Sequence, residues 1–541
     1  MHHGFSPPCL AQIGYAYMKN MRNGIISGAI VLSAAHLHGQ VAPYVADGFP
    51  QETHGWYFTI PFRPAPSAVP ARMMILDGAG HIAYHRPAPA ATDFRVWPDG
   101  RMSYAAGNMH RLMDSTFTVI DSVSCVGGTL TDRHDLRLLP NGHYLLLGTE
   151  FITMDLSGYG LFLGNNSPGS ATATVECGVI QELDSAQNLL WEWHLADHFD
   201  FLETDTTRLN DPEEVDWSHC NAVEMDVDGN ILLSSRHFNE ITKIDRQADT
   251  IIWRLGGANN DFTFVDDPGF YWQHDIRRLP DGHITLFDNS RPGAHPGRGV
   301  EYALDEALFT ATPVWSRSFD TTAYSVAMGN MQRHADGNTL INWGFLSPDN
   351  AVFTVYGPDS SRVRELRFLD TLSSYRSYYF DTLPFTLHRP AITCAPVDGG
   401  YQLTAADGWS VYQWSNGDTG QVTMAGMLDT VHVEVRFGQA NGWVRSEPFI
   451  VAEHCMSTAI GLHHAPTDVL YPDPAGSEVN IRFGGAPATR QVELMDALGR
   501  ILWQGTTTQS LIRLPLQGLP AGSYLVRVDG TIHRFLKDPA F

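Results

Sequence analysis

The chain has 541 residues, too many for one hydrophobic core, so we expect about two to four domains. Charged residues make up 17% and aromatic residues 11%, with 49 glycines and 32 prolines, a profile typical of a turn-rich, mostly β protein. The formal net charge is −24 at pH 7, which excludes nucleic acid and anionic lipid as natural partners of this surface. An anion-binding site would have to be a local exception to this field.

Residues 1–40 are predicted to be an upstream segment followed by a secretory signal peptide that begins at Met18. Lys19 and Arg22 form a short basic segment, and the apolar stretch 24–35 that follows is too short to span a bilayer. A short N-terminal anchor helix is the alternative. The signal peptide predicts an exported protein, in which disulfide bonds can form.

Between residues 41 and 388 the chain alternates short apolar runs with dense turn signals, a pattern typical of β-hairpins. The fullest unit, from His219 to Gly257, has the size of one four-stranded propeller blade. We therefore predict an all-β fold with a six-bladed β-propeller at 41–388, although five or seven blades remain open and a sandwich is the main rival. The four strands expected in the fullest unit are 222–227, 231–235, 241–245 and 250–255.

A ten-residue phrase with a histidine at its head occurs twice in this region. It reads HDLRLLPNGH at 134–143 and HDIRRLPDGH at 274–283. A looser copy begins at His219, and a fourth has Asn330 in place of the histidine. Because the first strand of each propeller blade lines the central channel, the leading histidines of different blades are expected to converge at one mouth. The second histidine of each phrase lies past a turn, away from that mouth.

Arg236 and His237 directly follow the second predicted strand of the unit that His219 opens. A hairpin returns its second strand to the end where the first began, so we expect Arg236 to lie near His219. Imidazoles and a permanent guanidinium gathered inside an acidic protein suit an oxyanion such as sulfate or phosphate.

Three interpretations of the histidines compete. One histidine is a nucleophile, or the group binds a metal, or the rings close structural hydrogen bonds between blades. The metal interpretation is disfavoured because Arg236 would repel a cation and no carboxylate ligand shares the phrase. Asp135 and Asp275 either orient the rings or form turns. We therefore predict neither a metal nor a cofactor.

Residues 391–456 are predicted to form a small immunoglobulin-like β-sandwich, and a linker follows at 457–467. Cys394 and Cys455 bracket this module and are the expected disulfide. Cys125 with Cys177 is a second candidate pair. The remaining cysteine, Cys220, is either catalytic or a small buried residue next to His219; free cysteines are commonly buried.

Three motifs follow in order at the end of the chain: YPDPA, VELMDALGR and LPAGSYLVRV, at 471–475, 492–500 and 519–528. In this order they resemble the type A C-terminal sorting domain of the type IX secretion system, with Asp473 where an asparagine is usual. The resemblance implies a β-sandwich sorting domain at 468–541 and a Bacteroidetes-type bacterium. It also implies the type IX secretion machinery as a partner, export through the periplasm and outer membrane, and a secreted or cell-surface protein.

Four motifs in the predicted propeller also follow a recognisable order: RHD at 133–135, WSHCNA at 217–222, LSSRH at 233–237, and WQH at 272–274 with its continuation TLFDN at 285–289. Together they resemble the bacterial arylsulfate sulfotransferases, which need no nucleotide sulfate donor. The resemblance covers residues from about 130 to 345. It implies a six-bladed propeller with its site at the channel mouth, where a histidine is transiently sulfated.

Residue by residue, the resemblance assigns four site positions. His274 matches the nucleophile, and His219 and Arg236 match the residues that hold the sulfuryl oxygens. His134 matches the histidine that handles the phenol proton or binds sulfate. His237 has no matching role. The implied reaction is a ping-pong transfer, through a sulfohistidine, of a sulfuryl group from a small phenolic sulfate donor to a phenolic acceptor.

Two departures from the family pattern bear on this hypothesis. Residues 290–293 replace a usual Gly-Asp-Gly stretch, which puts the acceptor side of the pocket in question. Cys220 and Asp275 also stand where the family often has other residues. Two alternatives therefore stay open: a non-catalytic extracellular propeller that binds ligands, and a metal-dependent hydrolase or lyase.

Overall fold

The structure is a computed structural model, and nearly all of its regular secondary structure is β. The chain divides into two compact units, Met1–Cys455 and Met456–Phe541. The predicted signal peptide lies outside the described residues, and no helix of the described residues is long and apolar enough to cross a membrane. Description covers 41–541 apart from 51–53, 64–70, 161–167, 210, 320–323, 347–350, 370–371, 437–441, 456–468, 472–474, 484–488, 497–499, 530 and 538–541.

Four successive sheets of the first unit are each built around four consecutive antiparallel strands. Two of these sheets gain a short parallel strand. β13 (Glu214–Asp216) pairs with β11 (Ala173–Leu183), and β18 (Thr263–Phe264) pairs with β22 (Thr310–Ser318). The strands of the first two sheets are β5 (Ala91–Val96), β6 (Met102–Ala106), β7 (His110–Met113) and β8 (Val119–Val123), then β9 (Leu130–Leu138), β10 (Tyr144–Met154), β11 (Ala173–Leu183) and β12 (Leu189–His194). Those of the next two are β14 (Cys220–Met225), β15 (Ile231–Ser235), β16 (Glu240–Asp245) and β17 (Thr250–Gly256), then β19 (His274–Arg278), β20 (Ile284–Asp288), β21 (Arg298–Asp305) and β22 (Thr310–Ser318).

Two further sheets join the beginning of the described chain to residues more than 300 positions later. In one, β27 (Ser373–Phe380) pairs with β2 (Trp56–Phe62), which continues into β3 (Arg72–Asp77) and β4 (Ile82–Pro87). In the other, β1 (Tyr44–Asp47) adds to the outer edge of β23 (Asn330–Arg333), β24 (Thr339–Asn342), β25 (Phe353–Tyr356) and β26 (Arg362–Phe368). Each sheet thus combines strands from both ends of this region, which holds the ends together.

The inner strands of the six sheets contact one another in a closed cycle. The order is β5, β9, β14, β19, β23, β27 and back to β5. The hydrophobic core lies between successive sheets: Leu232 and Trp253 of one sheet pack against Ile276 and Leu286 of the next. Because neighbouring sheets cover both faces, the second strands β15 and β20 are fully buried, whereas outer strands such as β8 and β12 are largely exposed.

The predicted four-stranded unit is confirmed, since β14 to β17 form one antiparallel sheet in that order. The two copies of the repeated phrase also fold alike. In each copy the turn glycine, Gly142 or Gly282, has a φ of +84° or +91° and donates its N–H to the leucine three residues earlier, at 2.9 and 3.0 Å. Glycine adopts this left-handed conformation without the steric cost of a Cβ.

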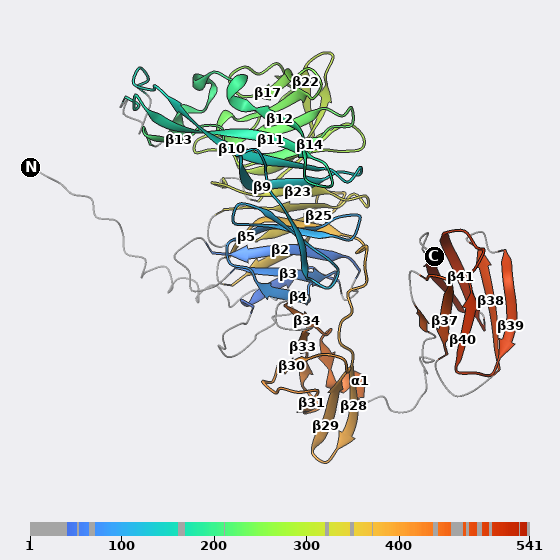
Figure 1. Ribbon diagram of the computed structural model, residues 1–541. Coiled ribbons are helices and arrows are strands. Elements are labelled where there is room, and N and C mark those ends of the chain that lie inside the picture. The colour runs from blue at the N-terminus through green and yellow to red at the C-terminus, as the bar shows by residue number, and fades with distance from the viewer. Residues whose placement is uncertain are drawn as a thin grey trace, which may run out of the picture. The chain divides into compact units, whose positions relative to one another are not determined.

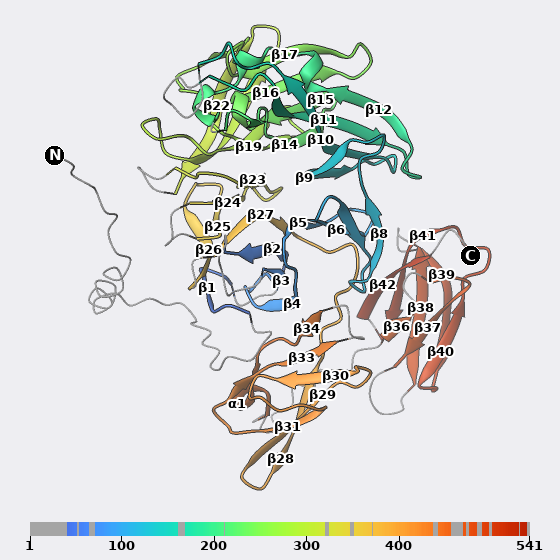
Figure 2. The same cartoon turned by 60° about the vertical axis from the view of Figure 1, so that its left-hand side comes forward.

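The segment after the six sheets continues the sheet of β2 to β4. β34 (Trp443–Arg445) pairs with β4, and β33 (Val433–Arg436) and β30 (Val411–Trp414) follow, so one seven-stranded sheet runs from β27 into this module (Figures 1 and 2). The module's buried Trp414 shares a core cluster with Tyr84 of β4. The other elements are β28 (Ile392–Val397), β29 (Gly400–Ala405), β31 (Val422–Ala425), β32 (Thr430–Val431), β35 (Phe449–Ile450) and the short helix α1 (Val451–Cys455).

Of the two expected disulfides, one is confirmed and one is wrong. Cys394 and Cys455 are bonded. Cys125 and Cys177 are free, because they lie on opposite faces of the β9–β12 sheet: Cys125 packs beside Leu146, whereas Cys177 packs with Leu145 and Leu147. Cys220 is free and buried.

The second unit contains two sheets that pack around a core with Val479, Ile481, Leu494 and Val526. This is the β-sandwich expected for the end of the chain. The strands are β36 (Val469–Tyr471), β37 (Glu478–Arg482) and β40 (Leu511–Pro515) in one sheet, and β38 (Arg490–Asp496), β39 (Ile501–Thr507), β41 (Gly522–Val528) and β42 (Thr531–Lys537) in the other.

Candidate active site

The four predicted site residues come from three adjacent sheets. His134 lies within β9, His219 immediately precedes β14, and His274 is the first residue of β19. Arg236 begins η6 (Arg236–Phe238), directly after β15, and its backbone N–H donates to the His219 carbonyl at 3.1 Å. The expectation that the hairpin returns Arg236 to His219 is therefore confirmed.

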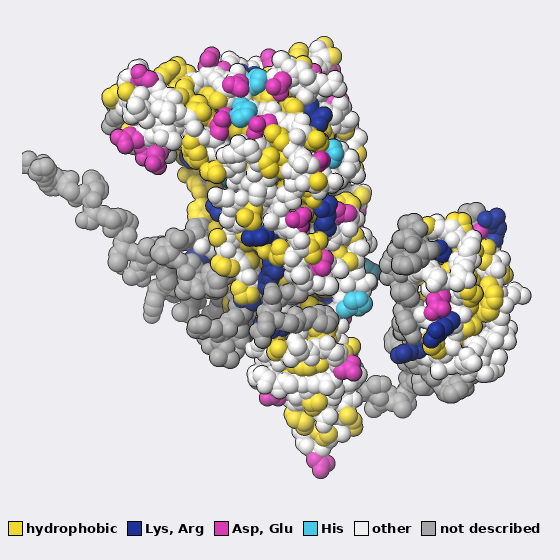
Figure 3. Space-filling view, viewed as in Figure 1, with side chains coloured by type: hydrophobic (Ala, Val, Ile, Leu, Met, Phe, Trp, Pro, Cys, Tyr) yellow, Lys and Arg dark blue, Asp and Glu magenta, His cyan; other side chains and the backbone are white. Residues whose placement is uncertain are grey.

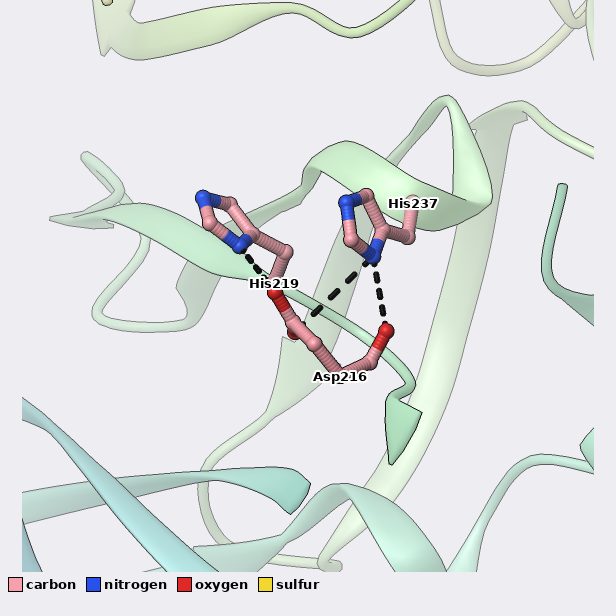
Figure 4. A group of neighbouring side chains, drawn as sticks. All are labelled: Asp216, His219 and His237. Carbon is pink, nitrogen blue, oxygen red and sulfur yellow. Dashed lines mark hydrogen bonds and ion pairs between the residues drawn. The ribbon is translucent and has the colours of Figure 1, made fainter. Parts of the chain in front are cut away.

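Three imidazoles lie in a row. The ring centroids of His134 and His219 are 5.0 Å apart, and those of His219 and His237 are 4.8 Å apart with nearly parallel planes. Each of the first two rings donates from Nδ1 to a carboxylate: His134 to Asp132 at 2.5 Å, and His219 to Asp216 at 2.6 Å (Figure 4). These bonds leave both Nε2 atoms free of the carboxylates that orient the rings.

The two carboxylate-bound histidines differ in their electrostatics. Burial lowers the pKa of His134, but the charge of Asp132 and the hydrogen bond to it outweigh burial, and the pKa ends above its ordinary value. Burial also lowers the pKa of His219, and there Asp216 does not compensate, so that pKa ends below its ordinary value. Of the two rings, His134 therefore keeps its second proton up to the higher pH.

His274 is buried, and its hydrogen bonds fix its tautomer. Nδ1 donates to Asn289 Oδ1 at 2.7 Å, and Nε2 accepts from the backbone N–H of Met328 at 3.2 Å. Burial is the largest cause that holds the pKa of His274 well below its ordinary value, and the charge of Arg236 is the second. His219 and His134 lower it further, which places all four predicted residues within electrostatic reach of one another. A neutral imidazole with its lone pair on Nε2 is the nucleophilic form.

Arg236 is buried among donors and acceptors of the same site. Its guanidinium donates to His237 Nε2 at 2.8 Å and to the Val326 carbonyl at 2.6 Å. Burial, and then the nearby charge of Arg208, lower the pKa of Arg236 to about 10. His237 is held neutral as well, because burial and then His219 lower its pKa to about 3.

The backbone around the site adopts left-handed conformations at non-glycine residues. The φ angles are +45° at His219, +54° at Trp272, +61° at Asp275 and +65° at Met328. Such conformations each cost of the order of 1 kcal/mol or more and gather at functional sites in many proteins. Two of these residues make contacts within the site: His219 bonds to Asp216, and the Met328 N–H bonds to His274 Nε2.

A cavity of about 180 Å³ is lined by Arg208, Asp216, His219, Arg236 and His237 among others, whereas His134 and His274 are not among its lining residues. It has room for a tetrahedral oxyanion, since one water molecule takes about 30 Å³. A larger cavity, of about 470 Å³, contains none of the four predicted site residues. Acidic side chains occur over much of the visible face, with a group near β13 (Figure 3). The small cavity combines two guanidiniums, Arg208 and Arg236, with the acidic residues Asp211, Glu214 and Asp216 of its lining.

The sequence missed the residues that orient the histidines. We expected Asp135 and Asp275 to orient rings or to form turns, and both interpretations are wrong. Asp135 pairs with Arg376 at 2.9 Å, and Asp275 pairs with Arg277 at 2.7 Å, in a buried cluster of charges on the inner strands. Asp132, Asp216 and Asn289 orient the rings instead. Two of them lie two or three positions before their histidine, a spacing that was visible in the sequence.

The structure also changes the argument about metals. Asp216, His219 and His237 have ligand atoms close enough to hold an ion, so a carboxylate does share the site (Figure 4). The ring nitrogens, however, are engaged: His219 Nδ1 donates to Asp216, and His237 Nδ1 donates to the Asp216 carbonyl at 2.8 Å. Arg236 bonds to the same His237, and its charge opposes a cation at this place.

The family model described as arylsulfotransferase (ASST) matches residues 39–376. The chain belongs to the arylsulfotransferase family. A second family model, the secretion system C-terminal sorting domain, matches residues 469–537. This match confirms the predicted type IX export and places the protein outside the cell or on its surface.

Solved structures similar to this family member are distant from it, and no curated protein matches the chain. A protein of unknown function from Bacteroides caccae is 11% identical, with a TM-score of 0.37, and covers 60% of this chain and 98% of its own. Virginiamycin B lyase from Staphylococcus aureus is 10% identical, with a TM-score of 0.31 and coverage of 71% and 99%. PorZ, a type IX secretion component of Porphyromonas gingivalis, is 11% identical, with a TM-score of 0.27 and coverage of 86% and 68%. At these scores the likenesses carry no argument about function.

Proposed function

We propose that the protein is an aryl-sulfate sulfotransferase that works by a ping-pong mechanism through a sulfohistidine at His274. The observation that supports this most is the state of His274: it is buried and neutral, with its proton on Nδ1 and its lone pair on Nε2. A guanidinium and a row of imidazoles lie next to it, which is the surrounding that an incoming anionic group requires.

In the first half-reaction, His274 Nε2 attacks the sulfur of the aryl sulfate. The N–S bond forms while the S–O bond to the phenol breaks, and Arg236 stabilises the charge on the sulfuryl oxygens. His219 adds to this in its protonated form, in which Nε2 carries a proton to donate, because its Nδ1 proton is bonded to Asp216. The Met328 N–H, which bonds to Nε2 in the free protein, has to release that lone pair first. Asn289 keeps accepting the Nδ1 proton, so it holds the sulfated ring in place.

His134 gives its Nε2 proton to the departing phenolate. Of the two carboxylate-bound histidines, His134 has the raised pKa and His219 the lowered one, which favours His134 as the acid. In the second half-reaction the neutral His134 takes the proton of the acceptor phenol. The phenol oxygen then attacks sulfur, the N–S bond breaks, and free His274 returns.

The six sheets act in this proposal as the six blades of one propeller. The closed cycle of inner-strand contacts supports the count, and the starts of those strands carry the site. Residues 391–456 are proposed as an immunoglobulin-like module, and the disulfide and the buried Trp414 support that assignment. The predicted domain limits stay predictions.

An acceptor-dependence assay tests the function. Full-length protein is mixed with an activated aryl sulfate, and release of its phenol is followed with and without a second phenol. We expect the second phenol to accelerate release and to appear as its sulfate ester, with parallel lines in double-reciprocal plots. Chelators should leave the rate unchanged.

Two results would favour the alternatives. Binding of the aryl sulfate without turnover would make the protein a binding module. Loss of activity on chelation, restored by a divalent metal, would point to the Asp216, His219 and His237 cluster as a metal centre instead.

A further inference from the structure

Arg208 is a second guanidinium at the site, and neither the sequence motifs nor the family comparison gives it a role. It is the last residue of η5 (Thr206–Arg208), in the connection between the β9–β12 and β14–β17 sheets. Its guanidinium carbon lies 4.6 Å from the ring centroid of Trp272, and that of Arg236 lies 5.5 Å from the same ring. Both arginines line the cavity of about 180 Å³.

The two charges are not neutralised by the protein. Among the described residues, neither Arg208 nor Arg236 forms an ion pair with a carboxylate, and the Nε of each is buried without a hydrogen-bond partner. The two nearby acids are already used: Asp216 accepts from His219, and Asp205 accepts from Trp272 Nε1 at 3.2 Å. Asp211 and Glu214, on the rim of the cavity, are exposed, so solvent screens them.

Two adjacent, partly buried cations repel each other unless an anion lies with them. The proximity of Arg208 is the second-largest cause of the lowered Arg236 pKa, and Asp216 and Asp205 do not compensate for it. Trp272 holds both guanidiniums through cation–π contacts with its ring. The arrangement therefore suits an oxyanion that accepts hydrogen bonds from both arginines at once.

We infer that Arg208 is a binding residue of this site, which pairs with Arg236 to hold the sulfuryl oxygens of the aryl sulfate, and that the two together also bind inorganic sulfate. The inference rests on the proposed function for the aryl sulfate, while the binding of inorganic sulfate stands independently of turnover. It assigns the anionic group that binds first to the cavity between η5 and η6. Because His274 does not line that cavity, the sulfur has to move from there to His274 Nε2 before the attack.

The test measures inorganic sulfate binding to the full chain by calorimetry at fixed ionic strength. We expect Arg208→Gln to weaken binding by about 10- to 100-fold, the value of a hydrogen bond to a charged group. Arg208→Lys should recover part of the affinity, because lysine keeps the positive charge but lacks the paired N–H donors of the guanidinium. The control is Arg291→Gln, since Arg291 also stacks on an aromatic ring, Tyr271 at 4.0 Å, but does not line this cavity.

Kinetics separate binding from structure. If Arg208 holds the donor, Arg208→Gln raises KM for the aryl sulfate more than it lowers kcat, while the unfolding temperature stays within a few degrees of wild type. Wild-type binding that Arg208→Gln leaves intact, or a loss of equal size in Arg291→Gln, overturns the inference, as does a wild type that binds no sulfate. A wild type that binds sulfate through Arg208 but turns over no aryl sulfate contradicts the proposed function alone.

Discussion

The repeated phrase supplies two clusters that differ in their electrostatics. Its leading histidines, His134 and His274, belong to the candidate active site with His219 and Arg236. Its next acidic and basic residues lie in the buried cluster of charges, where Asp135 and Asp275 meet Arg277, Arg376 and Arg95. The same few residues of each repeat thus serve two sites a short distance apart.

In the buried cluster every charge has a partner. Arg376 is fully buried between Asp135, at 2.9 Å, and Asp275, at 3.2 Å. Burial alone would raise the pKa of Asp135. The charges of Arg277 and then Arg376 outweigh burial and hold that pKa well below its ordinary value. In the candidate active site, by contrast, the pKa values of His219, His237 and His274 are lowered, and two guanidiniums have no carboxylate partner among the described residues. From this difference we infer that the buried cluster of charges stabilises the fold and that the candidate active site binds a ligand.

The largest effect on activity is expected from a substitution in the candidate active site. His274→Ala removes the proposed nucleophile and should lower kcat by about 10⁴- to 10⁶-fold, as loss of a nucleophile does in other covalent enzymes. The matched control is His283→Ala, from the same copy of the phrase. His283 bonds to Glu301 at 2.7 Å, outside the site, so its loss should leave kcat near wild type. Equal effects of the two substitutions would remove the distinction between leading and second histidines.

The buried cluster should respond in stability. Asp135→Asn leaves three buried guanidiniums with one fewer counter-charge, and we expect the free energy of unfolding to fall by about 3–5 kcal/mol. Urea denaturation measures this, and activity per folded molecule should change far less. Because the folded pKa of Asp135 is depressed, its contribution to stability is present above the unfolded pKa and is lost as the pH falls through the folded value. An active-site defect without loss of stability would contradict this assignment.

The pH profile sharpens the contrast between the two bonded histidines. His274 stays neutral well below the ordinary histidine range, so the acid limb of kcat should lie below about pH 6.5. With a poor phenol leaving group, the rate should fall as the pH rises through the raised pKa of His134, because the acid loses its proton. Asp132→Asn removes the charge that raises that pKa, so the alkaline limb should move to lower pH. A limb that stays in place would exclude His134 as the acid.

The smallest effect is expected at Cys220, for which the sequence left two roles open: a catalytic cysteine or a small buried residue. Burial raises the pKa of its thiol to about 12, so it is not a thiolate at neutral pH. Cys220→Ala should keep kcat unchanged and cost about 1 kcal/mol of stability or less, as a small change in a packed core. Measurable loss of kcat with an intact fold would revive a catalytic cysteine beside His219.

The sequence predicted what local geometry and repetition determine. The four strands of the His219 unit, the Cys394–Cys455 bond and the meeting of Arg236 with His219 all follow from hairpin geometry or spacing. The pairing of Cys125 with Cys177 failed because spacing does not show that the two lie on opposite faces of a sheet. The Met328 N–H on His274 and the extension of β4 by β34 join segments far apart in the chain, and no local pattern indicates them.

The most direct measurement is peptide mass analysis of the full chain after brief exposure to an activated aryl sulfate. The account predicts one sulfuryl group on the peptide that carries His274, absent from His274→Ala and removed on addition of a phenol. A protein that turns over aryl sulfate without that group on His274, or with it on another residue, would contradict the account.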